Sequence, residues 1–218
     1  MLRSVLTGDI ESSTRMSEDE LKHILKVVRD EVVELEEQQI LSETEFYRGD
    51  SFQVLVKRPE EALRAALIVK TAVNKMITDK SLGKRSKKMY DVAISIGLGE
   101  VSGKSGADTQ NGRPYILSGR GLDLLKEKHL TLGLFSGDEE NDITYRTIFE
   151  LYHWIIKHWS VSSAELVYHK LQNKTEQQIA PLLGISQSAV NQRSRAACWN
   201  GLEQLLCHYR EIGVTKYG

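Results

Sequence analysis

Apolar positions along the first 135 residues follow two periods, one typical of strands and one of helices. Short apolar, β-branched runs predict strands over residues 2–7, 44–47, 51–56, 90–98 and 130–135. Apolar residues at helical spacing predict helices over residues 17–38, 59–73 and 118–126. The order of these elements predicts an α+β ferredoxin-like domain, in which one helical layer covers one sheet.

The pattern becomes entirely helical after an acidic linker, GDEEND, at residues 137–142. We therefore expect two domains, an α+β domain over residues 1–138 and a helical domain over residues 139–218. Helices are predicted over residues 141–159 and 161–171, and the wide apolar face of the first is expected to be core. Further helices should follow, the last of them running on through Trp199 and Leu202 to about residue 212.

The segment TEQQIAPLLGISQSAVNQRSR at residues 175–195 has the spacing of a helix-turn-helix. Its glycine-containing turn separates two short helices, and the motif is expected to span residues 175–196. The apolar residues that should pack the two helices together are Ile179, Leu182, Leu183, Ile185 and Val190. The side chains expected to reach DNA are Gln187, Ser188, Asn191, Gln192, Arg193 and Arg195.

This segment resembles helix-turn-helix regulators and the last region of bacterial sigma factors, which implies double-stranded DNA as a partner. The alternative is that two short helices joined by a glycine imitate the motif. Pro181 favours that alternative, because proline removes an intrahelical hydrogen bond.

The composition is that of an ordinary globular protein, with 40% hydrophobic and 27% charged residues and a net charge of -1. No global basic field would drive DNA binding, so we expect modest affinity per subunit and a homodimer on a palindromic site. No apolar run approaches the length of a membrane span, and no signal peptide is evident. The two cysteines, Cys198 and Cys207, fit no metal-ligand spacing. We expect a cytoplasmic protein with no membrane partner.

Two aspartates could form a metal site in the first domain. Asp9 ends the first predicted strand, and Asp50 lies at the tip of the predicted hairpin. Two carboxylates at one sheet edge suit Mg²⁺ or Mn²⁺, with substrate phosphates completing the coordination. The backbone and hydroxyls of Ser12, Ser13 and Thr14 would suit the phosphates of a nucleotide. Alternatively, both aspartates only shape turns.

The motifs TGDIESST at residues 7–14, RGDSF at 48–52 and ISIGLGE at 94–100 resemble the metal-binding motifs and the next strand of class III nucleotide cyclases. Together with LSGRGLD at residues 117–123, they more closely resemble the SatD family. These resemblances imply that Asp9 and Asp50 are metal ligands and that Ile10 lends its backbone carbonyl. Arg48 is a candidate phosphate contact, although a surface cation would look the same in sequence.

The same comparison shows departures from the cyclase pattern. Active class III cyclases carry an Asn and an Arg, four residues apart, where this chain has Asp123 and Glu127. Carboxylates there oppose the stabilisation of developing phosphate charge. A base-selecting Lys is replaced by Phe46. We therefore expect no catalytic residues, and a transcriptional regulator whose degenerate cyclase-like domain senses a metal-nucleotide of unknown identity.

Two other interpretations stay open at this point. The first is a divergent nucleotidyl cyclase, or another nucleotide-processing enzyme, whose helical tail serves only to dimerise. The second is a structural sensor in which the two aspartates bind nothing.

Overall fold

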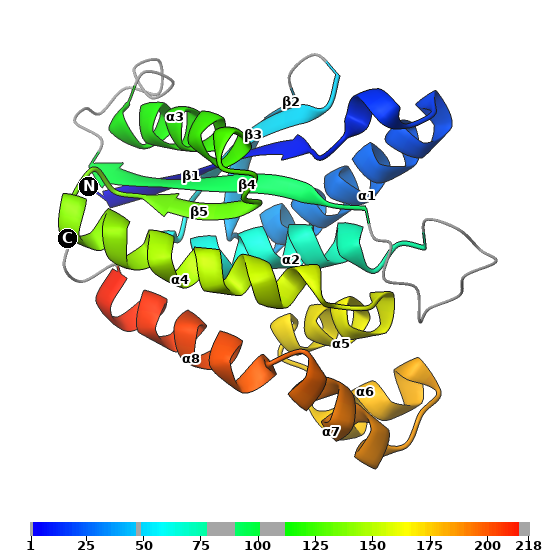
Figure 1. The fold of residues 1–218 in the computed structure, drawn as a ribbon. Coiled ribbons are helices and arrows are strands. Elements are labelled where there is room, and N and C mark those ends of the chain that lie inside the picture. Colours follow the sequence, from blue (N-terminus) through cyan, green and yellow to red (C-terminus); the bar gives the residue numbers. More distant parts are fainter. Residues whose placement is uncertain (1, 47–48, 78–89, 101–111, 214–218) are drawn as a thin grey trace.

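The computed structural model describes residues 2–46, 49–77, 90–100 and 112–213. It has a mixed α/β sheet unit followed by a helical region (Figure 1). The five strands are β1 (Leu2–Ile10), β2 (Leu41–Phe46), β3 (Ser51–Val56), β4 (Val92–Glu100) and β5 (Leu132–Phe135). Their order in the sheet is β2-β3-β1-β4-β5, and all neighbours are antiparallel except β4 and β5. The central strand β1 therefore carries the start of the chain through the middle of the sheet.

Helices cover both faces of this sheet, whereas the sequence predicted one helical layer. Helix α3 (Arg113–Glu127) lies on one face, and α1 (Glu18–Glu37) and α2 (Ala62–Asn74) lie on the other (Figure 1). On β1, Thr7 faces α3, since its hydroxyl donates a hydrogen bond of 2.8 Å to the Ser118 hydroxyl. The second layer follows from β4, which is buried along all but its last residue, a pattern typical of strands covered on both sides.

Helix α3 approaches β4 closely because Gly97 has no side chain. A Cβ atom there would lie 2.1 Å from the Pro114 carbonyl oxygen and 2.6 Å from the Ser118 backbone nitrogen. Both are backbone atoms, so the clash can be relieved only by moving the helix away from the strand. That helix also carries residues of the candidate site described below.

We expect Gly97→Ala to lower the free energy of unfolding by about 2 kcal/mol or more, as overpacked cores do. Urea unfolding followed by circular dichroism measures this change. Gly119→Ala is the matched control, because Gly119 lies on α3, the helix that packs against Gly97, and nothing lies within 4 Å of the added Cβ. That control should be neutral or slightly stabilising. Equal stability of the two variants would contradict the close packing of α3 on β4.

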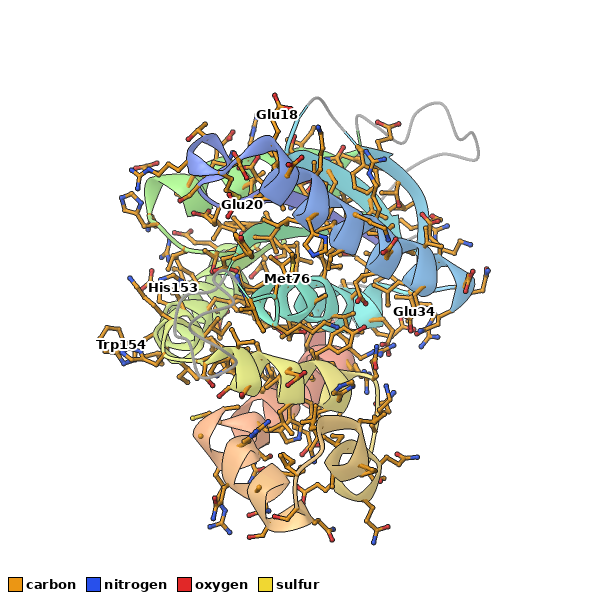
Figure 2. The ribbon with its side chains drawn as sticks, turned by 90° about the vertical axis from the view of Figure 1, so that its right-hand side faces the viewer. Glu18, Glu20, Glu34, Met76, His153 and Trp154 are labelled. Carbon is orange, nitrogen blue, oxygen red and sulfur yellow. The ribbon has the colours of Figure 1, made fainter. Side chains whose placement is uncertain are left out.

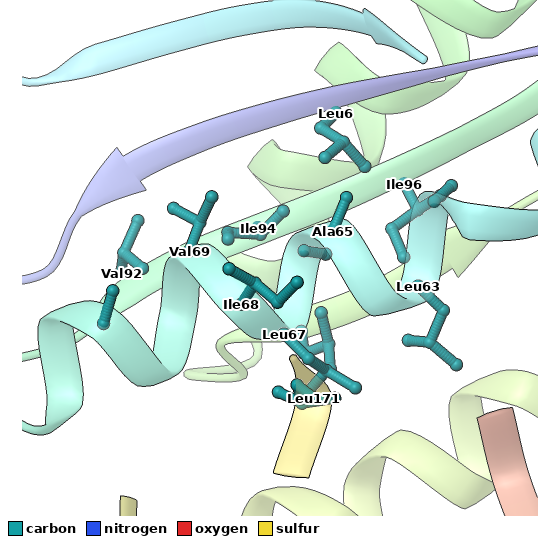
Figure 3. Packing of buried hydrophobic residues seen from close by; sticks show 14 of the residues in the cluster. Leu6, Leu63, Ala65, Leu67, Ile68, Val69, Val92, Ile94, Ile96 and Leu171 are labelled. Atoms are coloured by element: carbon teal, nitrogen blue, oxygen red, sulfur yellow. The ribbon is translucent and has the colours of Figure 1, made fainter. Parts of the chain in front are cut away.

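The helical region consists of α4 (Glu139–Lys157), α5 (Val161–Leu171), α6 (Glu176–Leu183), α7 (Gln187–Ala196) and α8 (Trp199–His208), followed by a π-helical turn at Tyr209–Gly213. One hydrophobic cluster runs from the sheet through α2 into α4, α5 and α8. Figure 3 shows Leu67 of α2 next to Leu171 of α5 within this cluster. Polar contacts also join the two regions, since the Tyr209 hydroxyl donates to the Pro59 carbonyl over 2.8 Å. The division of the chain near residue 138 stays a prediction.

Two expectations about the helical region need correction. The helix that starts at Gln187 ends at Ala196, because Cys198 adopts a left-handed conformation with a φ of 56° and α8 begins anew after it. The face of α4 is also only partly core, since Leu151 and Trp154 are each 66% exposed. In contrast, Trp199 and Leu202 are buried, as core residues should be.

Candidate functional site

Asp9 and Asp50 lie on adjacent backbone segments at one end of the sheet. Asp9 is opposite Ser51 in the pairing of β1 with β3, so Asp50 directly precedes the residue that faces it. The Ile10 backbone N–H donates a hydrogen bond of 3.1 Å to the Asp50 carbonyl oxygen. Strand β1 extends through Ile10, so Asp9 is held within the ladder rather than in a turn. Strand pairing therefore brings together the backbones of the two aspartates that the sequence singled out.

Each carboxylate already has a partner within the chain. The Ser13 hydroxyl donates a hydrogen bond to the Asp50 carboxylate, which ties the 3₁₀ turn at Ser13–Arg15 to the hairpin. The Lys126 ammonium of α3 forms an ion pair with Asp9, with 2.8 Å between Nζ and Oδ2. The Asp9 side chain is 16% exposed and that of Lys126 is 46% exposed. Among the described residues, Lys126 therefore places a partly exposed cation next to Asp9.

A second acidic pair lies beside Asp9. Burial raises the pKa of Glu11, and the charges of Asp91 and Asp9 raise it further, while Lys70 and Lys126 act in the opposite direction. Lys70 is fully buried and forms an ion pair of 2.5 Å with Asp91. It also donates to the Val92 carbonyl over 2.9 Å, which anchors α2 to the start of β4. Acidic groups thus gather at this end of the sheet, with two lysines among them.

The chemical types of the donors at this edge are those that a hard divalent cation prefers. Two carboxylates and a backbone carbonyl are oxygen ligands, which Mg²⁺ and Mn²⁺ prefer. No group of three or more His, Cys, Asp or Glu side chains arranged for a metal occurs within the described residues, so other ligands would come from solvent or substrate. Ser12 and Thr14 are exposed beside Ser13, and Ser12 has a left-handed φ of 60°. Arg48 lies outside the described residues.

The end of α3 supplies a cation that the sequence pattern did not reveal. Asp123 and Glu127, which the sequence resemblance matched to the Asn and Arg of cyclases, are both exposed. Lys126 lies one helical turn beyond Asp123 and reaches the Asp9 carboxylate. Side chains three positions apart share a helix face, so Lys126 lies on the side of α3 that also carries Asp123, but its contact with Asp9 depends on how α3 crosses β1.

Replacing Lys126 with methionine should separate the effect of Lys126 on metal binding from its effect on phosphate binding. Without the competing ammonium, Mn²⁺ alone should bind a few-fold more tightly, since a partly exposed ion pair contributes about 0.2–1 kcal/mol. The Mn²⁺–nucleotide complex should bind more weakly, because a cation facing its phosphates is lost. Isothermal titration calorimetry with Mn²⁺ and with Mn²⁺–ATP or Mn²⁺–GTP measures both constants. Lys128→Met, on an exposed side chain just past α3, is the control.

Helices α6 and α7 form a compact pair at the end of the molecule farthest from the sheet (Figure 1). Thr175 closes a capping box at the start of α6, and Ser186 caps α7. Between them Gly184 adopts a left-handed φ of 64°, which an L side chain rarely allows. Ile179 and Val190 are fully buried with Leu166 of α5. The pair thus has its own small core, supported by α5.

The polar face of α7 points to solvent. Arg193 is half-buried, and the other side chains expected to reach DNA are exposed, namely Gln187, Ser188, Asn191, Gln192 and Arg195. The sequence of α7 contains two arginines and no acidic residue. One packing expectation is wrong, since Leu182 is 57% exposed. The buried cluster at the helix pair instead joins Ile179 and Val190 to Leu166 of α5.

Comparison with known proteins gives a distant structural neighbour. No protein-family model matches the chain, and no curated protein matches its sequence. Among solved structures, the crystal structure of the guanylyl cyclase Cya2 aligns with a TM-score of 0.33 and 14% sequence identity, over 55% of this chain and 70% of that one. None of the described helices has both the length and the apolar character that crossing a membrane requires. The assignment of function below therefore rests on the residues and their geometry.

Proposed function

We propose that the chain is a cytoplasmic transcriptional regulator that binds double-stranded DNA through α7. In this proposal α6, the turn at Gly184 and α7 form a helix-turn-helix, and α7 enters the major groove. The observation that carries it is the exposed polar face of α7, free of acidic groups and presented at one end of the molecule. The buried trio of Leu166, Ile179 and Val190 supports it by fixing α7 on the body of the protein.

The side chains on α7 match what base and phosphate recognition requires. Gln187 and Asn191 are amides near the start of the helix, where recognition helices contact base edges. Amide side chains pair with adenine in the major groove through two hydrogen bonds. Arg193 and Arg195, in the last turn, suit phosphate oxygens. A single short helix offers few phosphate contacts, so the proposal includes a homodimer that reads two half-sites.

We further propose that the sheet unit, with a ferredoxin-like and cyclase-like topology, binds a divalent metal with a nucleotide. Asp9, Asp50 and the Ile10 carbonyl would hold Mg²⁺ or Mn²⁺, and the metal would neutralise charge on the phosphates. Ser12, Ser13 and Thr14 would face the phosphates, and Arg48 is a further candidate from the sequence alone. The motif resemblance to the SatD family supports this part of the proposal, as does the adjacency of the two aspartates.

One observation favours a second candidate, a divergent nucleotidyl cyclase. Lys126 places a cation beside Asp9, where an enzyme would need one to stabilise developing phosphate charge. Product formed from ATP or GTP with Mn²⁺, and lost in both Lys126→Met and Asp50→Asn, would support it. Nucleotide binding without turnover would leave the regulator as the better proposal.

Selection from a random double-stranded DNA library tests the DNA-binding proposal. The native chain should enrich a short sequence with two-fold symmetry, and fluorescence anisotropy should give a much higher affinity for it than for scrambled DNA. Specific complexes are typically about 10³-fold or more tighter than non-specific ones. No enrichment at low salt, with or without Mn²⁺ and nucleotides, would overturn the proposal.

A further inference from the structure

Helix α4 exposes an apolar stripe. Ile143, Leu151 and Trp154 are 45%, 66% and 66% exposed, and they are among the few large apolar side chains that the described residues expose. Their spacing of eight and three positions places them on one helix face. Figure 2 shows Trp154 projecting from the edge of the molecule, away from the other elements. Large apolar side chains gathered on one exposed helix face are a feature of interaction sites.

Charged and polar residues flank this stripe in an ordered way. The first turn of α4 carries Glu139 and Glu140, whereas its end carries Lys157 and His158. Arg146 and Glu150 lie between them. Within the part of the chain that the structure describes, none of these six side chains forms an ion pair. The helix dipole explains acidic residues at the start and basic ones at the end, but not their alignment with the exposed apolar face.

This arrangement is complementary to itself when a second copy runs antiparallel. A two-fold axis between residues 148 and 149 would set Ile143 against Trp154 of the second copy. The same axis pairs Glu139 with Lys157, Glu140 with His158, and Arg146 with Glu150, each from opposite copies. Along the sequence, the midpoint of each pair lies within half a residue of the point between residues 148 and 149 where the axis passes. A two-fold interface needs this kind of self-complementary surface.

We propose that the exposed face of α4, defined by Ile143, Leu151 and Trp154 with their charged flanks, is the interface of an antiparallel homodimer. Tryptophan and arginine are the side chains that most often anchor interfaces, and α4 supplies both. The 19 residues of α4 span about 28 Å at about 1.5 Å per residue. One helix pair buries an area at the low end of stable interfaces, below about 1,200 Å². We therefore expect a reversible dimer whose population depends on protein concentration.

Sedimentation velocity over a concentration series, without DNA or nucleotide, tests the interface independently of the proposed function. The native chain should pass from monomer to dimer as its concentration rises. Trp154→Glu and Leu151→Glu should raise the dissociation constant at least 10-fold. Val33→Glu is the matched control, because Val33 is 52% exposed on α1, away from this face. A monomer at every concentration, or a dimer unaffected by Trp154→Glu, would overturn the proposal.

Charge reversal tests the antiparallel register. Glu139→Lys should weaken the dimer several-fold, and adding Lys157→Glu in the same chain should restore it. The helix dipole alone predicts that the double variant is less stable than the single variant, because its substituted charges oppose the dipole at both ends of α4. Thermal unfolding at a concentration where the protein is monomeric separates helix stability from pairing. Failure of the second substitution to restore the dimer would overturn the register.

Discussion

Asn191→Ala should weaken binding to the selected DNA site by about 5- to 150-fold, the range expected when one good pair of hydrogen bonds to a base, worth about 1–3 kcal/mol, is lost. Asn191 is exposed one turn into α7, on the same face as Gln187 and Ser188. The effect should be confined to specific DNA, because Asn191 is neutral and contributes little to phosphate binding. Arg195→Ala should instead weaken binding to all sequences and reduce the salt slope by about one.

Fluorescence anisotropy with the selected site and a scrambled duplex, at several salt concentrations, measures both effects. Asn200→Ala is the control, since Asn200 is an exposed asparagine on α8 rather than on α7. Its affinity for both duplexes should equal that of the native chain. Equal losses for Asn191→Ala and Asn200→Ala would exclude α7 as the recognition helix.

Asp9→Asn and Asp50→Asn should each abolish the metal-dependent thermal stabilisation by a nucleotide. In the native chain, a ligand present at 100 times its dissociation constant adds about 2.7 kcal/mol to the free energy of unfolding. A neutral amide cannot replace the charge with which a carboxylate holds Mg²⁺ or Mn²⁺. Asp50→Asn should also keep the hydrogen bond from Ser13, since an amide oxygen accepts one.

Melting temperatures with each of the four nucleoside triphosphates, with and without Mn²⁺, measure this stabilisation. Asp123→Asn is the matched control, because it removes an exposed carboxylate from α3 without touching the Asp9–Asp50 edge. The nucleotides should shift the melting temperature of that variant as much as that of the native chain. A nucleotide shift that persists in both Asp9→Asn and Asp50→Asn would place the nucleotide elsewhere.

Much of the architecture follows from local periodicity. Helical spacing over residues 17–38 predicted α1, which begins after a capping box at Ser17, and the apolar run over residues 51–56 predicted β3. The position of α3 on the second face of the sheet could not be read in this way. It depends on Gly97, whose missing side chain lets the helix approach, and that is a contact between distant segments.

The candidate site shows the same division between local and distant information. The sequence identified Asp9 and Asp50, and strand pairing brings their backbones together. It did not identify Lys126, whose role depends on how α3 crosses β1. Leu182 and Leu151 were expected in cores, but helical periodicity fixes only which side chains share a face. Whether that face is covered depends on neighbours such as Leu166.

One coupling measurement decides whether the sheet unit controls DNA binding. The affinity for the selected DNA site is measured by anisotropy with and without Mn²⁺ and the nucleotide that stabilises the protein, for the native chain and Asp50→Asn. We expect this affinity to change by about 5- to 150-fold in the native chain, the usual range of coupling between two sites, and not at all in the variant. A native affinity that does not respond to the metal-nucleotide would contradict control of DNA binding by the sheet unit.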